Sequence, residues 1–141
     1  MRTLKGIVPP MITPLIDEDK LDYKGLENLV EHLISGGVHG LFILGTTGEG
    51  PSLSHGLRLD LINYVCKLNN GRIPVLVGIT DASFKEAIDI SGKSKEYGAQ
   101  AVVLAPPFYF QIDQHELYNY TSQLIDELPL PVFLYYNPGL T

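Results

Sequence analysis

Hydrophobic residues gather along the chain in short runs that are nearly continuous rather than alternating with polar residues. The runs cover residues 6–12, 39–44, 74–79, 101–105 and 131–136. Strands that are buried on both faces of a parallel sheet have this pattern. We therefore predict five parallel strands.

Between the runs, hydrophobic residues recur every three or four positions, which is typical of helices that bury one stripe. The predicted helices cover residues 26–34, 57–68, 84–97 and 117–128. Two of them carry a cap signal at their start, in which Ser83 precedes Glu86 and Asp113 precedes Glu116 by three residues. Strands and helices thus alternate along the chain.

This alternation fits either a doubly wound open sheet or a (β/α)8 barrel. A dinucleotide-binding open sheet has a glycine-rich turn after its first strand, whereas here the first run continues into a proline-containing acidic loop, PPMITPLIDEDKLD. We predict an α/β fold of the (β/α)8 TIM-barrel class, of which this chain supplies roughly the first five strands and four helices. Because a complete barrel takes about 250 residues, residues 1–141 are expected to be the N-terminal portion of a single TIM-barrel domain, ending at strand five.

Composition excludes several classes of protein. The net charge is −6 and Lys and Arg form no dense cluster, so neither nucleic acid nor a membrane is an expected partner. The single cysteine, Cys66, fits a reducing compartment, and we expect a cytoplasmic protein. No pair of histidines has the spacing of metal ligands, so no metal site is predicted.

In α/β barrels the functional side chains lie at the carboxyl ends of the strands. In this sequence those positions hold mainly hydroxyl and phenol groups: Thr13, Gly45, Thr46, Thr47, Glu49, Thr80, Asp81, Tyr109, Tyr135 and Asn137. Considered singly, Tyr109 fits a packing or interface residue better than a catalytic one. Tyr135 likewise fits a core tyrosine that bonds to a backbone carbonyl.

The segment GTTGEG, residues 45–50, follows the second run and lacks the lysine of a phosphate-binding P-loop. With no lysine or arginine nearby, a phosphate dianion would be poorly neutralised. The successive amides of such a turn, a threonine hydroxyl and the positive end of the following helix suit a carboxylate instead. The alternative is that the glycines only permit a tight turn, and the spacing alone leaves both interpretations open.

Five segments together resemble one family over the whole chain: KGIVPPMITPL, GLFILGTTGEGPSLS, PVLVGIT, GAQAVVLAPPFYF and PVFLYYNPGLT. They are similar to the dihydrodipicolinate synthase/N-acetylneuraminate lyase family. The resemblance implies a pyruvate-dependent class I aldolase on a (β/α)8 barrel, usually a homotetramer, with no cofactor. A lysine would form a Schiff base with pyruvate, and the enamine would add to an aldehyde, or the reverse step would cleave a sugar acid.

The resemblance also implies roles for individual residues. Gly45, Thr46 and Thr47 are expected to bind the carboxylate of pyruvate. Thr46, Tyr135 and, from a neighbouring subunit, Tyr109 are expected to form a proton relay. Such a chain of hydroxyl groups can move protons without adding charge beside an iminium ion.

The sequence departs from the family pattern at three places. Leu140 stands where the synthases have an arginine that binds the carboxylate of the aldehyde, which argues against that particular reaction; the sugar-acid branch tolerates an apolar residue there. Phe108 replaces one of two adjacent tyrosines. His55 begins a helix whose first turn is usually acidic in the family, and this change is expected to alter local stability only.

No lysine of this sequence fits the Schiff-base position. The lysines are Lys5, Lys20, Lys24, Lys67, Lys85, Lys93 and Lys95. None ends a predicted strand, and in the family the lysine belongs to the sixth strand, beyond Thr141. The chain is therefore either the front portion of a pyruvate lyase or a non-catalytic partial barrel that pairs its edges with another chain. A barrel enzyme for a phosphorylated substrate is a third hypothesis.

Overall fold

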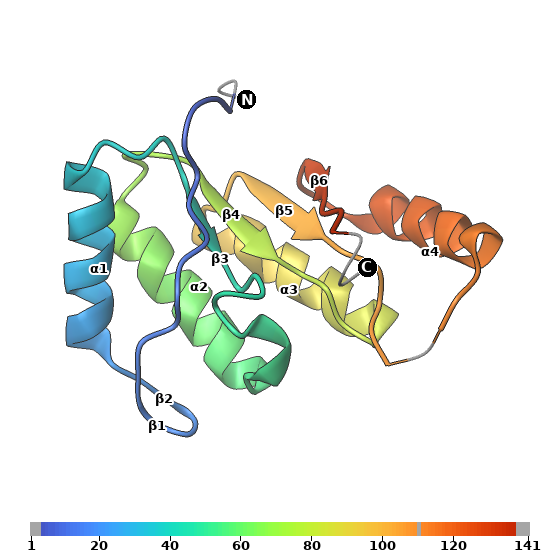
Figure 1. Ribbon diagram of the computed structural model, residues 1–141, viewed down its shortest axis with the longest axis horizontal. Coiled ribbons are helices and arrows are strands. Elements are labelled where there is room, and N and C mark those ends of the chain that lie inside the picture. The colour runs from blue at the N-terminus through green and yellow to red at the C-terminus, as the bar shows by residue number, and fades with distance from the viewer. Residues whose placement is uncertain (1–3, 110, 138–141) are drawn as a thin grey trace.

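The structure is a computed structural model that describes residues 4–109 and 111–137. Its main sheet has four parallel strands in the order in which they occur along the chain (Figure 1). They are β3 (Leu41–Ile43), β4 (Val75–Gly78), β5 (Ala101–Leu104) and β6 (Val132–Leu134). A doubly wound sheet reverses its strand order at a switch point, whereas this sheet continues in one direction, as the wall of a barrel does.

The four predicted helices are confirmed. They are α1 (Tyr23–Ser35), α2 (His55–Asn69), α3 (Phe84–Tyr97) and α4 (Gln114–Glu127). The predicted caps also form, because the Ser83 hydroxyl accepts the Glu86 amide at 3.3 Å and Asp113 and Glu116 form a reciprocal capping box. Local sequence signals thus account for where these helices begin.

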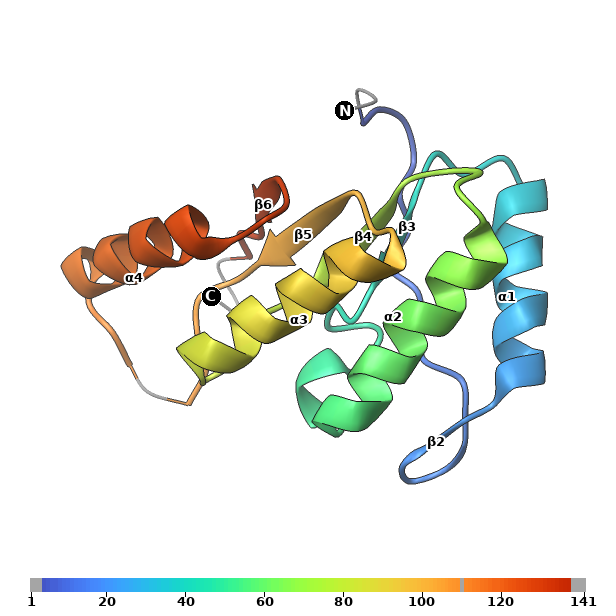
Figure 2. The same cartoon turned by 180° about the vertical axis from the view of Figure 1, so that it is seen from behind.

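Helices α2 and α3 pack side by side over one face of the sheet, with α1 beside α2 (Figures 1 and 2). Helix α4 reaches α3 through Tyr120, whose ring centroid lies 5.7 Å from that of Phe84. Strand side chains that point into this helical layer are almost completely buried: Leu41, Ile43, Val75, Val77, Ile79, Val102 and Leu104. Burial of each such side chain stabilises the fold by about 1.5–3 kcal/mol.

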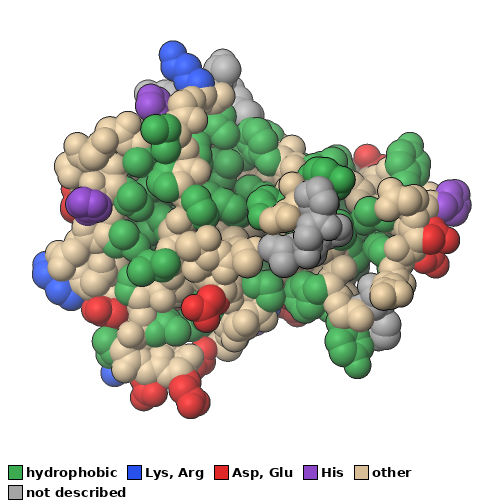
Figure 3. Space-filling model, in the orientation of Figure 1, with side chains coloured by type: hydrophobic (Ala, Val, Ile, Leu, Met, Phe, Trp, Pro, Cys, Tyr) green, Lys and Arg blue, Asp and Glu red, His purple; other side chains and the backbone are tan. Residues whose placement is uncertain are grey.

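The opposite face of the sheet carries a second, smaller cluster of hydrophobic residues. Its members are Leu76, Ala101 and Val103, with Leu4, Val8, Phe42 and Tyr135 packed against them. Figure 3 shows hydrophobic side chains gathered in the middle of this face. In a closed barrel this face would be the interior.

The first predicted strand is only partly correct. Residues 6–12 run beside β3, but they form a single parallel bridge, between Pro10 and Phe42. The Met11 amide donates to the Phe42 carbonyl at 2.8 Å, and the Phe42 amide donates to the Pro9 carbonyl at 3.1 Å. Pro9 and Pro10 have no N–H to extend this ladder, so the segment is extended without forming a regular strand.

Two further differences concern the edges of the fold. The predicted acidic loop contains a short antiparallel hairpin of β1 (Leu15–Asp17) and β2 (Lys20–Leu21), which the sequence analysis did not predict. Strand β6 was predicted to be buried, but Phe133 and Leu134 are 36% and 64% exposed. The reason is that β6 pairs only with β5 among the described residues. No helix in residues 4–109 and 111–137 is both long and apolar enough to cross a membrane.

Candidate active site

The GTTGEG segment forms a compact turn directly after β3. The Gly45 carbonyl accepts the amides of Gly48 at 3.0 Å and Gly50 at 3.3 Å. Leu44 and Glu49 have positive φ angles of 58° and 54°, which are costly for residues with a side chain. A Cβ atom on Gly50 would lie 2.3 Å from the Leu44 carbonyl oxygen, so a glycine is required there by the close approach of the two backbones.

The top of this turn leaves hydrogen-bond donors available. Thr46 and Thr47 are both exposed, and neither their amides nor their hydroxyls have an acceptor among residues 4–109 and 111–137. Two successive amides and two hydroxyls can together accept an anion with two oxygen atoms. The turn is therefore suited to a carboxylate, although the glycines serve the fold as well.

Helix α2 does not follow the GTTGEG turn as directly as predicted. A 3-10 helix, Gly50–Ser52, comes between the turn and α2, and the Ser54 hydroxyl already accepts the Leu57 amide of α2 at 3.2 Å. The first amides of α2 are therefore partly satisfied within the protein. The donors nearest to Thr46 are those of the turn itself.

Two adjoining hollows lie on the open face of the sheet, at the carboxyl ends of its strands. They have volumes of about 280 and 370 Å³, close to the ~300 Å³ at the lower end of small-molecule sites. Both are lined by Phe42, Thr46, Val103 and Tyr135. Gly45 lines the first and Thr47 the second, so we refer to the two together as the trough.

Tyr135 lies at the end of β6, on the other side of the trough from the turn. Its amide donates to the Leu104 carbonyl at 2.8 Å, which continues the β5–β6 pairing by one residue. Its hydroxyl accepts a hydrogen bond from the Asn137 side chain at 3.3 Å. The structure thus brings Thr46 and Tyr135, which are far apart in sequence, to one hollow.

Tyr109 is placed differently. It is 87% exposed, has a φ angle of 81° and does not line the trough. The structure therefore separates Tyr109 from Thr46 and Tyr135 within one chain. Leu140, which stands where the synthases have an arginine, lies outside the described residues.

Thr80 was predicted to lie at a strand end, without a role, and the structure places it in the trough. Its Oγ1 accepts the Ala105 amide at 2.9 Å. The next residue, Asp81, forms a largely buried ion pair with Arg58 at 2.8 Å. Burial opposes ionisation of Asp81, but hydrogen bonds from Ser83 and Arg58 outweigh it and hold the pKa of the carboxyl below its ordinary value.

All seven lysines of the sequence lie within the described residues, and none of them lines the trough. Lys20 lies in β2 and Lys5 precedes the segment beside β3, while the others are on helices. The lining residues that the structure describes also include no arginine or histidine. This neutral trough is a poor site for a phosphate dianion, which disfavours the third hypothesis.

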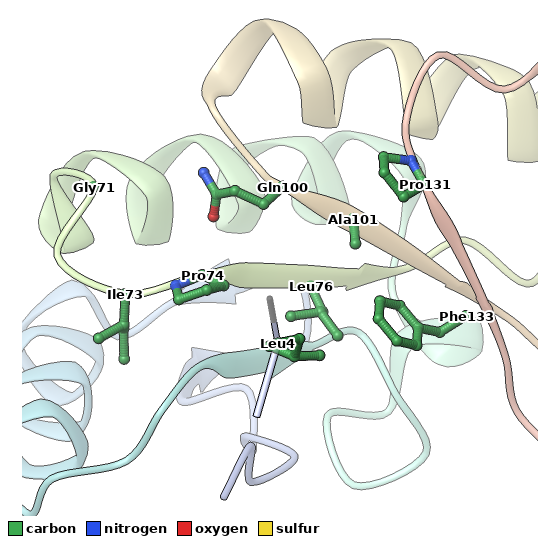
Figure 4. Close-up of a pocket in the computed structure, with 9 residues that line it drawn as sticks. All are labelled: Leu4, Gly71, Ile73, Pro74, Leu76, Gln100, Ala101, Pro131 and Phe133. Carbon is green, nitrogen blue, oxygen red and sulfur yellow. The ribbon is translucent and has the colours of Figure 1, made fainter. Parts of the chain in front are cut away.

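A third hollow, of about 320 Å³, lies at the opposite ends of the strands (Figure 4). Pro74, Gln100 and Pro131, which line it, each directly precede a strand. Figure 4 shows Leu4, Leu76 and Phe133 on the same side of the sheet. The hollow is mainly apolar, and in barrels this end contributes to stability rather than to chemistry.

The histidines form no metal site within the described part of the chain, where no group of three His, Cys, Asp or Glu residues could hold an ion. His55 instead contacts two carboxylates of α3, with Nδ1 2.5 Å from Glu86 and Nε2 3.1 Å from Asp89. It therefore links α2 to α3 at the surface.

Comparison with known proteins identifies the family. The sequence profile of the Dihydrodipicolinate synthetase family matches residues 3–141. The chain belongs to this family. A curated relative, a probable 2-dehydro-3-deoxy-D-pentonate aldolase of Escherichia coli K12, is 34% identical over 141 residues, which are 100% of this chain and 47% of the relative.

Solved structures of the family agree. The dihydrodipicolinate synthase of Bacteroides thetaiotaomicron is 51% identical with a TM-score of 0.92, over 98% of this chain and 46% of that one. A family member from Escherichia coli K12, solved in complex with pyruvate, is 34% identical with a TM-score of 0.91, over 96% of this chain and 46% of the other.

These comparisons confirm the predicted family and the predicted barrel class. The solved relatives are (β/α)8 barrels, and this chain matches about half of each. The chain spans about half the length of the curated relatives it matches. The relatives are named as synthases and aldolases, so the family is one of enzymes.

Proposed function

We propose that this chain provides the pyruvate site of a Schiff-base lyase or aldolase that forms or cleaves a C–C bond between pyruvate and an aldehyde. The observation that carries the proposal is the trough. There, Thr46 and Thr47 have donors without an acceptor among the described residues, and Thr46 shares a hollow with Tyr135. The pyruvate complex of a family member supports the choice of ligand.

The reaction follows from the chemistry of an amine and a 2-oxo acid. A lysine amine attacks C2 of pyruvate, and the carbinolamine loses its hydroxyl as water after protonation. Removal of a proton from C3 gives the enamine, whose C3 attacks the aldehyde carbon, and water then releases the product. The hydroxyls of Thr46 and Tyr135 would supply and receive these protons.

The nucleophile has to come from elsewhere, because no lysine of this chain lines the trough. We propose that residues 1–141 are the N-terminal portion of a single barrel domain in a longer cytoplasmic protein. The remaining strands would supply the lysine and cover the open face of the sheet. The partner substrate would be an aldehyde or a sugar acid.

Tyr109, which is 87% exposed, would act in a homo-oligomer by entering the relay of a neighbouring subunit. A mixture of Tyr109→Phe subunits with subunits that lack the trough hydroxyl, Tyr135→Phe, tests this in the longer protein. If Tyr109 acts across subunits, the mixed oligomers regain part of the activity that each variant lacks. Equal inactivity of mixed and unmixed oligomers would contradict the role.

The alternative function is a partial barrel that binds without catalysis, which the absence of a trough lysine favours for the 141 residues on their own. Borohydride reduction in the presence of pyruvate separates the two. The longer protein should gain one reduced pyruvyl group on a lysine, detected by mass spectrometry, and the 141-residue chain should gain none. The Thr46→Val variant of the longer protein should form the adduct more slowly. If the unmutated longer protein forms no adduct on a lysine, the lyase proposal is refuted.

A further inference from the structure

The first hollow of the trough holds few polar side chains. Among the lining residues that the structure describes, only Thr46, Thr80 and Tyr135 carry a hydrogen-bonding group on the side chain. Phe108, which replaces a tyrosine of the family pattern, lines the same hollow and adds none. Thr80 follows β4, whereas Thr46 follows β3 and Tyr135 follows β6, so each of the three polar side chains comes from the end of a different strand.

The position of the Thr80 hydroxyl is fixed from several directions. Its Oγ1 accepts the Ala105 amide at 2.9 Å. The preceding residue, Ile79, is completely buried and donates its amide to the Val103 carbonyl at 3.0 Å. The following residue, Asp81, is held by its ion pair with Arg58. A hydroxyl that is held in this way loses little conformational entropy when it binds a ligand.

The Thr80 hydroxyl also retains its proton for donation. It acts as an acceptor toward Ala105, and its O–H has no acceptor among residues 4–109 and 111–137. No cationic side chain of residues 4–109 and 111–137 lines this hollow, so these residues offer no counter-charge to a second carboxylate beside Thr80. A neutral oxygen, such as a hydroxyl of the ligand, matches a neutral hydroxyl donor in apolar surroundings.

We propose that Thr80 is a specificity-determining residue that binds a hydroxyl group of the aldehyde, and so favours hydroxylated neutral aldehydes over unsubstituted or acidic ones. This proposal rests on the proposed function. The carboxylate of pyruvate occupies the donors at Thr46 and Thr47, and the hydroxyl beside the aldehyde carbon accepts from Thr80.

The test compares two aldehydes in the longer protein, after the borohydride adduct has been measured. Glyceraldehyde carries hydroxyl groups and propanal carries none. Thr80→Val should lower kcat/KM for glyceraldehyde about tenfold, as expected for the loss of one hydrogen bond, and leave that for propanal unchanged. Thr80→Ser should restore the preference, and Thr121→Val, a matched change on α4, should alter neither value.

Other results would overturn the proposal. Equal losses for both aldehydes in Thr80→Val would make Thr80 a positioning residue that acts through the Ala105 amide. Unchanged kcat/KM for both aldehydes would show that Thr80 has no role in selecting the aldehyde. If Thr80→Val does not fold, Thr80→Ala serves for the same comparison. Absence of the borohydride adduct in the unmutated protein would instead refute the proposed function, and the role of Thr80 with it.

Discussion

The two ends of the same parallel strands differ in how their polar groups are used. At the amino ends, the Gln100 side chain accepts the Val75 amide at 2.7 Å, and the Pro74 carbonyl accepts the Leu41 amide at 2.8 Å. At the carboxyl ends, Thr46 and Thr47 have donors that no described residue accepts. These polar groups at the amino ends are satisfied within the fold, whereas the turn at the carboxyl ends has donors without an acceptor among the described residues.

The difference has an energetic side. The turn at the carboxyl end places Leu44 in a left-handed conformation, a strain of about 1–3 kcal/mol that surrounding packing has to offset. The hydrophobic contacts between the sheet and its helices provide that packing. The comparison therefore predicts that substitutions near Leu44 affect ligand binding and stability together, whereas those at the amino ends affect stability alone.

Gly78→Ala is expected to have the largest effect. A Cβ atom there would lie 2.3 Å from the Leu44 carbonyl oxygen, so the backbone of the turn has to move. We expect a loss of about 1–3 kcal/mol in the free energy of unfolding and loss of pyruvate binding, measured by urea denaturation and by calorimetric titration.

The matched control is Gly92→Ala in α3, where an added Cβ meets no atom within 4 Å. It should stabilise the protein by up to ~1 kcal/mol through helix propensity and leave pyruvate binding intact. Equal stability of Gly78→Ala and the unmutated protein would contradict the steric argument.

Gln100→Ala should have a smaller effect, confined to stability. It removes the acceptor of the Val75 amide, which costs about 1 kcal/mol, and pyruvate binding should not change. Gln123→Ala, at an exposed site on α4, is the control and should change the free energy of unfolding by less than ~0.5 kcal/mol. A loss of pyruvate binding in Gln100→Ala would show that the two ends are coupled.

The smallest effect concerns pH. Because the pKa of Asp81 in the folded protein is held below its ordinary 3.8, its ionised form adds stability above that pH, and this is lost as the pH falls through 3.8 and below. Asp81→Asn should therefore be less stable at pH 7 and lose less of its remaining stability on acidification. Urea denaturation at several pH values measures this. Asp126→Asn, at an exposed site, should keep the original pH dependence, and an equally steep decline in Asp81→Asn would refute the contribution.

Several features could be predicted from the sequence because they depend on near neighbours along the chain. Hydrophobic periodicity and the cap residues Ser83 and Asp113 predicted the helices, and GTTGEG predicted the turn. The doubled proline was visible too, but its consequence was missed: residues 6–12 were predicted as a strand, although Pro9 and Pro10 cannot donate to a ladder. The β1–β2 hairpin was missed because its three- and two-residue strands carry no periodic signal.

Only the tertiary structure decided which strand-end residues meet. Thr46, Thr80 and Tyr135 share a hollow because parallel pairing of β3 to β6 aligns their carboxyl ends, whereas Tyr109, which the sequence places in the same class, lies outside it. Such contacts arise between residues far apart in the chain. Their geometry is set by strand register and side-chain packing, which no local pattern contains.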